Sequence, residues 1–221
     1  SPIINNSSNL KNSLNLSFYK DDLSLDTNLD IYEDLNKTDN DRYEYVPNFS
    51  FSKVIGNNYS LDTEGYIKNY NTNVTEKVLI NNLKYSSISK YFDNGILNNN
   101  NFLLKNVNSD ATNSSSFKNK SSSNLIPTFQ ANYLYPLEKE SKNFRKTLTP
   151  KLSFRLSPNN TKNLRKTDRT IDYNNIFDFE RLSVGDAVEG GFSATYGYEY
   201  IKSNKLNSEQ KIKFGLANNL R

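Results

Sequence analysis

The sequence contains no cysteine, histidine, methionine or tryptophan. Without cysteine it forms neither disulfides nor thiolate zinc sites. Without histidine it lacks the usual general base of a Ser-His-Asp triad and the commonest ligand of transition metals. Catalysis would therefore have to use carboxylates, lysine or tyrosine. We predict that the protein is not an enzyme and that it has no cofactor.

Long hydrophobic runs are absent as well. Hydrophobic residues make up 35% of the chain and the mean hydropathy is -0.78. No run approaches the roughly 18 to 20 apolar residues of a membrane-spanning helix, so a helical membrane protein is excluded. A membrane β-barrel is not excluded, because half of each spanning strand faces a polar lumen and lowers the mean hydropathy.

Charge of one sign does not dominate either. The chain has 28 basic and 24 acidic residues, interleaved along its length, for a net charge of +4. No basic stripe predicts a nucleic-acid partner. The chain begins at Ser1 without the features of a signal peptide and ends at Arg221 just after an alternating stretch, so we expect an interior piece of a longer protein.

Aromatic residues, in contrast, are abundant: they form 13% of the chain, and 15 of them are tyrosines. The segment from Glu189 to Ile201 alternates between apolar residues and small or polar ones. A period of two residues is typical of a strand with one apolar and one polar face, and strands of membrane barrels have this pattern. The residues predicted to face lipid are Phe192, Ala194, Tyr196, Tyr198 and Tyr200 in this strand, and Ile212, Phe214 and Leu216 in the last one.

The same alternation predicts about ten strands and no helix. Strands of about ten residues match the roughly 9 to 11 that cross a bilayer, whereas soluble sheets more often use about 5 to 6. We therefore predict an all-β fold: an antiparallel, up-and-down transmembrane β-barrel, of which residues 1–221 form one partial barrel domain. Turns are predicted near Asp21, at 36–41, at Gly56, at the asparagine run 98–101 and at 113–124, with a bend or bulge at Pro47.

The connection 157–187 interrupts this rhythm and is far longer than a hairpin turn. Connections of this length are uncommon and are usually functional or disordered. Its apolar residues, which include Ile171, Tyr173, Phe177 and Phe179, indicate that it packs on another part of the protein. We predict a long inserted loop that folds against the lumen or mouth of the barrel.

Between Asp168 and Tyr200 the sequence contains a motif of Asp168, Asp172, Asn175, Phe177, Arg181, Asp186, Glu189, Gly190 and Gly191. With this motif the segment resembles the LptD family of outer-membrane proteins for lipopolysaccharide assembly, formerly called organic-solvent-tolerance proteins. Tyr135-Pro136-Leu137 and Thr149-Pro150-Lys151 also resemble the two strands that precede this segment in the family. Two positions depart from the family pattern, because its glycine is displaced to Gly185 and Ala187 stands where an arginine usually follows the aspartate.

The resemblance implies a very large barrel in the outer membrane of a Gram-negative bacterium. Such a barrel receives lipopolysaccharide from a periplasmic Lpt bridge and releases it into the outer leaflet through a seam between its first and last strands. The implied partners are lipopolysaccharide, that bridge, an LptE-like lipoprotein in the lumen, and the lipid of the outer membrane. This chain would be a middle section of the barrel wall, with the seam outside it.

The carboxylates of the long connection allow more than one interpretation. Hard cations take carboxylate ligands, but ion pairs with Arg165, Arg169 and Arg181 are the simpler explanation, with Arg181 bonded to Asp186 or Glu189. We therefore predict no metal site. A glycosidase pair formed by Asp186 and Glu189 would need a sugar cleft that nothing here indicates. The carboxylates concerned are Asp168, Asp172, Asp178, Glu180, Asp186 and Glu189.

Two further motifs have alternative functions. Gly190-Gly191 is not followed by the Lys-Ser/Thr of a phosphate loop, so a strand start with close backbone approach is the expected role. The tyrosine row Tyr196, Tyr198 and Tyr200 could stack on sugars, although lipid contact at the headgroup level is favoured. Apart from lipopolysaccharide insertion, the sequence leaves open another outer-membrane porin or uptake channel, or a soluble β-rich adhesin or carbohydrate-binding module.

Overall fold

The computed structural model describes residues 8–38, 42–70, 74–158, 170–181, 185–206 and 210–221. The chain divides into two compact units, one of residues 1–83 and 105–125 and the other of residues 84–104 and 126–221. The strands are β1 (Asn9–Lys20), β2 (Leu23–Asp34), β3 (Tyr43–Ile55), β4 (Tyr59–Tyr70), β5 (Val74–Ser86), β6 (Lys90–Tyr91), β7 (Leu97–Thr112), β8 (Ser122–Leu134), β9 (Leu137–Glu140), β10 (Phe144–Ser157), β11 (Gly191–Asn204) and β12 (Lys211–Leu220).

All regular elements in these ranges are strands of one antiparallel sheet, which confirms the predicted all-β class. Ten of them are hydrogen-bonded in the order β1-β2-β3-β4-β5-β7-β8-β10-β11-β12, while the short β6 and β9 pair with β7 and β10. Each long strand thus pairs with its neighbours in the sequence, as in an up-and-down meander. The described residues form no helix that is long and apolar enough to cross a membrane.

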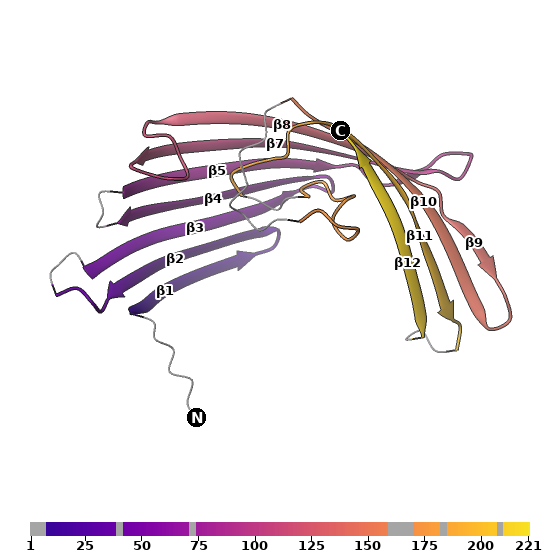
Figure 1. The fold of residues 1–221 in the computed structure, drawn as a ribbon, viewed down its shortest axis with the longest axis horizontal. Helices are drawn as coiled ribbons and strands as arrows, with labels where there is room; N and C mark the ends of the chain where they lie inside the picture. Colours follow the sequence, from indigo (N-terminus) through magenta and orange to yellow (C-terminus); the bar gives the residue numbers. More distant parts are fainter. Residues whose placement is uncertain (1–7, 39–41, 71–73, 159–169, 182–184, 207–209) are drawn as a thin grey trace. The chain divides into compact units, whose positions relative to one another are not determined.

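In the first unit, β1 to β5 lie side by side (Figure 1). The predicted turn after β1 is present, with Asp21 at a φ of 49°, and so is the turn at Gly56, with a φ of 62°. The expected irregularity at Pro47 is a gap in the β3–β4 ladder rather than a bulge. The register is the same on both sides of the gap, at Tyr45↔Asn69 and Asn48↔Tyr66, so no extra residue is inserted. The gap itself is explained by proline, which lacks the N–H that would continue the ladder.

A small apolar core of this unit lies on one face of β5 and β7. Val78, Ile80 and Val107 are buried there, and Tyr66 and Phe117 pack against them. Phe117 belongs to the segment after Asn113 that was predicted as a loop. This loop is shorter than predicted, because β8 already begins at Ser122.

The asparagine run 98–101 was predicted as a turn, and this prediction is wrong. The run lies inside β7, and the turn is formed by the preceding residues, with Gly95 at a φ of 83°. Asparagine is disfavoured in strands because its amide competes with the backbone, but here the amides bond across the sheet. Nδ2 of Asn98 donates to the Asn132 carbonyl at 3.1 Å, and Nδ2 of Asn101 donates to Oε1 of Gln130 at 3.2 Å.

The alternation of apolar and polar faces is also less uniform than predicted. A row of amides and hydroxyls crosses β4, β5, β7 and β8 of the first unit. Oγ1 of Thr63 donates to Asn81 at 3.1 Å, Nδ2 of Asn81 to Asn106 at 3.3 Å, and Nδ2 of Asn106 to Ser123 at 3.2 Å. These partly buried polar groups therefore hydrogen-bond to one another across neighbouring strands.

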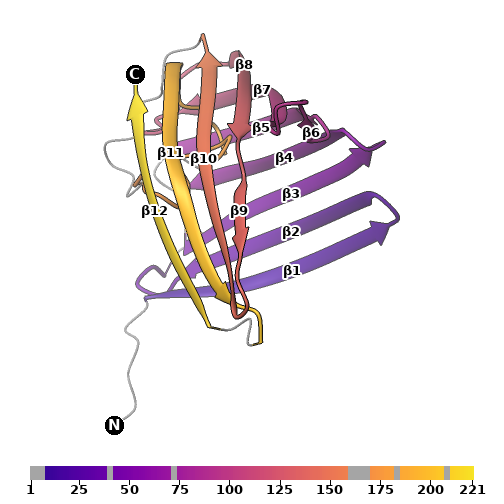
Figure 2. The same ribbon diagram turned by 90° about the vertical axis from the view of Figure 1, so that its right-hand side faces the viewer.

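In the second unit, β10, β11 and β12 run side by side, and β9 continues along β10 (Figure 2). The register fixes which residues share a face. Ser153 opposes Thr195 on one face, whereas Phe154 opposes Ala194 and Leu156 opposes Phe192 on the other. The strand predictions for this region are therefore confirmed, and the two faces can be compared.

Candidate functional site

The two faces of the second unit have opposite environments. On the polar face, Arg155 is 3% exposed and Thr195 is 2% exposed. On the apolar face, Phe192 is 58% exposed and Phe214 is 52% exposed. Protein therefore covers the polar side of these strands and leaves the aromatic side uncovered.

The cover of the polar face is the connection between β10 and β11. It begins its described part with a compact turn, in which the Asp172 amide donates to Oδ1 of Asn175 at 2.9 Å and the Ile176 amide donates to the Asp172 carbonyl at 2.9 Å. This turn brings the Phe177 carbonyl to β8, where it accepts from Nε2 of Gln130 at 3.0 Å. The connection is thus bonded to the sheet through its backbone.

Arg155 forms a second link between β10 and this connection. Its Nε donates to the Phe179 carbonyl at 3.2 Å, and its Nη1 donates to the Glu189 carbonyl at 2.6 Å. One side chain therefore holds two points of the loop that lie ten residues apart in the sequence. Both bonds are charge-assisted, and such bonds are about twice as strong as neutral ones.

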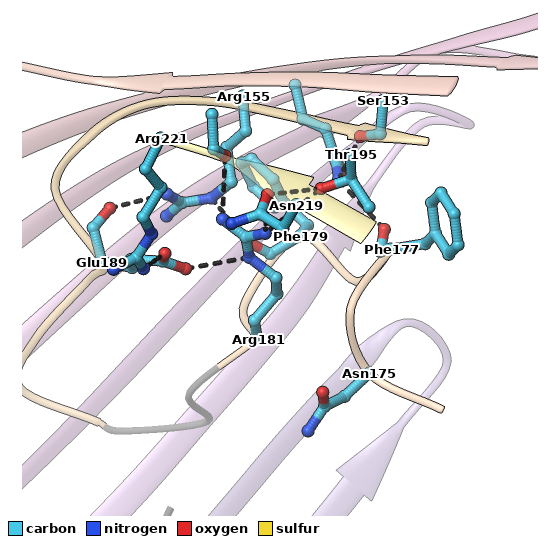
Figure 3. A network of polar contacts seen from close by, with 12 residues as sticks. Ser153, Arg155, Asn175, Phe177, Phe179, Arg181, Glu189, Thr195, Asn219 and Arg221 are labelled. Atoms are coloured by element: carbon cyan, nitrogen blue, oxygen red, sulfur yellow. Dashed lines mark hydrogen bonds and ion pairs between the residues drawn. The ribbon is translucent and has the colours of Figure 1, made fainter. Parts of the chain in front are cut away.

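Arg181 and Glu189 form the centre of the site, which we call the arginine knot (Figure 3). Nε of Arg181 lies 2.8 Å from Oε2 of Glu189, and both side chains are almost fully buried. Nη2 of Arg181 donates to Ser193 at 2.8 Å, and its Nη1 donates to Asn219 at 3.0 Å. Arg221 forms an ion pair with the other carboxylate oxygen of Glu189. The knot is defined as Arg155, Arg181, Glu189, Ser193, Thr195, Asn219 and Arg221.

The electrostatics of the knot favour a structural role. Burial lowers the pKa of the Arg181 guanidinium, because removal from water disfavours the charged form. Arginine nevertheless stays charged in proteins, so its charge has to be compensated in place. Glu189 supplies the countercharge, and the oxygens of Ser193, Thr195 and Asn219 accept three further hydrogen bonds from the guanidinium. A buried network with this many hydrogen bonds favours one arrangement of its members.

A second anchor of the loop lies at Gly215 of β12. The ring of Tyr173 rests on this glycine so closely that a Cβ there would lie 2.0 Å from Cζ of Tyr173. The Tyr173 hydroxyl lies 3.4 Å from Oε2 of Glu199, a carboxylate that also pairs with Lys213 at 2.7 Å and Lys151 at 3.6 Å. The glycine thus provides the space into which the loop inserts its tyrosine.

Comparison with protein-family models gives a match over residues 3–221 to the family described as LptD, LPS transport system D. The chain belongs to the LptD family. This family consists of β-barrel proteins of the Gram-negative outer membrane that act in lipopolysaccharide transport and assembly. A search of curated proteins finds no match. The family accounts for the all-β architecture, and the suspected resemblance is confirmed over nearly the whole chain.

The LptD motif residues occupy different places in the structure. Arg181 and Glu189 meet in the knot, and of the two partners considered for Arg181 the structure places Glu189 against it. Asp172, Asn175 and Phe177 form the turn that precedes the knot. Gly185, Asp186 and Gly190 lie in the segment that leads into β11, whereas Asp168, Arg165 and Arg169 lie outside the described residues.

The carboxylates of the LptD loop are dispersed among different partners. Glu180 lies 3.4 Å from the ammonium of Lys84, and Glu189 belongs to the knot. Within the described ranges, no three acidic residues come together as a group that could hold a metal ion. Two of the six carboxylates, Glu180 and Glu189, thus form ion pairs with basic side chains.

The expected role of Gly191 is corrected by the structure. A Cβ at this position would meet nothing within 4 Å, so close backbone approach does not require the glycine. Its φ of +94° does require it, because other L-residues rarely adopt this conformation. Close approach occurs instead at Gly197, where a Cβ would lie 2.3 Å from the carbonyl oxygen of Leu216 on β12.

Sequence reasoning did not find the partners that the sheet supplies to the LptD loop. Gln130, Arg155 and Asn219 come from β8, β10 and β12, and none of them belongs to a motif that the sequence singled out. Arginine is rare on a strand face that is buried by protein, so Arg155 was the strongest available signal. Its partners could not be known without the register of the sheet.

Proposed function

We propose that this chain forms part of the wall of an outer-membrane β-barrel that inserts lipopolysaccharide into the outer leaflet. The observation that carries the proposal is the inverted burial of the second unit, where Arg155 and Thr195 are covered and Phe192 and Phe214 are uncovered. A soluble sheet buries its apolar face and wets its polar face. Strands of a membrane barrel do the reverse, because lipid covers their outer side.

The exposed aromatic rings of this face favour lipid as its cover. Complete burial of a phenylalanine side chain contributes about 1.5–3 kcal/mol. The exposed rings of Phe154 and Phe192 stack on each other with centroids 6.4 Å apart, and those of Tyr198 and Phe214 lie 6.0 Å apart. Such a continuous aromatic surface would be costly in water. The residues proposed to face lipid remain Phe192, Ala194, Tyr196, Tyr198, Tyr200, Ile212, Phe214 and Leu216.

The proposed mechanism of this wall segment is passive, and the chain contributes no catalytic group. The polar face tolerates the sugars and phosphates of lipopolysaccharide, while the lipid tails move toward the bilayer without crossing water. The family match favours this function over a general porin or a soluble adhesin. The periplasmic Lpt bridge would deliver the lipid, and the seam of the barrel would lie in another part of the protein.

The first expected result concerns membrane integration of the full-length protein. We expect it to remain in the membrane fraction, to need detergent for extraction, and to migrate faster on a gel before heating than after. A closed barrel resists detergent until it is heated, which is the physical reason for the shift. A protein that is soluble without detergent and shows no shift would refute the barrel and leave a soluble β-rich module.

The long loop is proposed to lie on the lumenal side and to hold the barrel or its LptE-like plug. Its described part is bonded to β8, β10, β11 and β12 through Gln130, Arg155, Ser193 and Asn219. A segment tied to four neighbouring strands resists their separation. It also presents a fixed surface on the side where a plug would sit.

A deletion tests this role of the loop. Ser157 and Gly191 are register partners, so residues 158–190 can be replaced by Asn-Gly in a two-residue hairpin. We expect the β10–β11 ladder to form, but the barrel to assemble poorly or to lose its plug on purification. Heat-modified mobility and co-purification of the lipoprotein measure the two effects. A fully assembled and fully plugged barrel after this deletion would contradict the proposed role.

A further inference from the structure

Three lysines stand in one row across neighbouring strands of the second unit. Lys146 of β10 is the register partner of Lys139 on β9 and also of Lys202 on β11. Directly opposed residues project from the same face, and neighbouring strands lie about 4.8 Å apart, so the row spans roughly 10 Å. Like charges that oppose each other directly across a sheet are destabilising.

No carboxylate compensates this row within the described part of the chain. The two acidic side chains nearby, Glu138 and Glu140, project from the opposite face of the same strands. There they are already engaged, Glu138 with Arg145 and Glu140 with Lys205 at 2.6 Å. The polar face at this end therefore has its charges paired, whereas on the other face no described carboxylate pairs with the three lysines.

The lysine row lies beside a hollow of about 400 Å³ that is lined by Phe144, Lys202, Gln210, Lys211 and Ile212. The Lys202 ammonium sits 4.3 Å from the centre of the Phe144 ring. A cation–π contact of this kind holds the ammonium near the sheet instead of letting it extend into solvent. The hollow thus places a fixed positive charge next to apolar surface.

Apolar side chains begin at the next position along each strand that lies on the same face as the lysines. Leu148, two residues after Lys146, opposes Leu137 on one side and Tyr200 on the other, and Tyr200 opposes Phe214. Leu137 and Phe214 are both well exposed. The face therefore changes within one pair of residues from a row of ammonium groups to a row of apolar side chains. A lipid has the same change of chemistry at the junction of headgroup and acyl chains.

We propose that the row of Lys139, Lys146 and Lys202 binds the phosphate headgroup of an anionic lipid of the surrounding membrane. The acyl chains of this lipid lie along Leu148, Tyr200 and Phe214. The proposal rests on the proposed function, because it requires this face to meet lipid. Lysines at a water boundary are common anchors, but three in direct opposition repel one another, and a bound anion would remove that repulsion.

The test uses the full-length protein, purified in neutral detergent, and phosphatidylglycerol as the probe. This lipid carries the required charge without being the transported lipid. Native mass spectrometry measures its affinity for the wild type and for the triple variant Lys139→Gln, Lys146→Gln, Lys202→Gln. Each lysine near an anionic lipid surface contributes to the binding free energy. We therefore expect the triple variant to bind phosphatidylglycerol at least about tenfold more weakly than the wild type. Phosphatidylcholine, a zwitterionic probe, should bind both proteins equally.

Two matched variants separate charge from folding. The triple arginine variant of the same positions keeps the charge and should keep the affinity. The triple variant Lys90→Gln, Lys118→Gln, Lys120→Gln removes the same charge from exposed positions elsewhere and should change nothing. Should the first variant fold poorly, the single central change Lys146→Gln should still weaken phosphatidylglycerol binding severalfold while heat-modified mobility stays normal.

The results that would contradict the lipid site differ from those that would contradict the proposed barrel. Equal affinity of wild type and glutamine variant for phosphatidylglycerol would overturn the lipid site, and so would equal affinity of the wild type for phosphatidylglycerol and phosphatidylcholine. If inorganic phosphate displaced phosphatidylglycerol when both were present at similar concentrations, the three lysines would bind a free anion and not a lipid. Absence of heat-modified mobility in the wild type would refute the barrel itself and would be seen without any lipid.

Discussion

Replacement of Glu189 by glutamine is expected to lower the free energy of unfolding by about 3–5 kcal/mol, the usual cost of breaking a buried ion pair. Glutamine keeps the shape of the side chain but removes the negative charge that faces Arg181 and Arg221. Arg181 then remains buried without compensation. Unfolding in urea, followed by the loss of heat-modified mobility, measures the change.

A double variant shows whether the cost comes from the uncompensated charge. With Arg181→Gln and Glu189→Gln together, neither charge is left alone, so the double change should cost less than the sum of the two single changes. Arg145→Gln breaks the exposed pair with Glu138 and is the matched control, because exposed pairs contribute little. Additive costs in the double variant would show that the knot does not act as one unit.

Gly215→Ala is expected to expel the Tyr173 ring from its seat on β12 and to cost about 1–3 kcal/mol, as overpacking of a tightly packed site does. The added Cβ would lie 2.0 Å from Cζ of Tyr173, which is a severe steric clash. The loop then loses its contact with Glu199 as well. Limited proteolysis with chymotrypsin should show new cleavage after Tyr173.

Removal of the tyrosine should relieve this clash. In a Tyr173→Ala background, Gly215→Ala should have almost no further effect, because the ring that it displaces is absent. Ala194→Val on the opposite face of β11 is the control for added volume and should leave the loop protected. If Gly215→Ala destabilised the protein equally with and without the tyrosine ring, the glycine would serve the β12 backbone and not the loop.

The alternation of residue types was sufficient to predict the long strands of the second unit and their faces. Side chains of a strand alternate between its faces, so the even positions from Phe192 to Tyr200 had to lie together. The asparagine run 98–101 was mispredicted because local propensity favours turns for asparagine. Its amides instead bond to partners such as Asn132 and Gln130, about thirty residues further along the chain. No local rule can anticipate such partners.

The arginine knot shows the same limit at the site. Arg181 and Glu189 are eight residues apart, so their pairing was within reach of the sequence. Asn219 joins them only because β12 pairs with β11 in a register that opposes it to Thr195. The role of Gly191 was mispredicted for a related reason, since a positive φ is a property of the path that the chain takes into β11.

The sequence by itself determined the strand class, the apolar and polar faces, the family resemblance and the absence of histidine or thiol chemistry, because these follow from residue type and a period of two. The tertiary structure alone decided which face protein covers, which strands hold the long loop, and that three lysines stand in one row. Those facts depend on register, which brings residues together from distant parts of the chain.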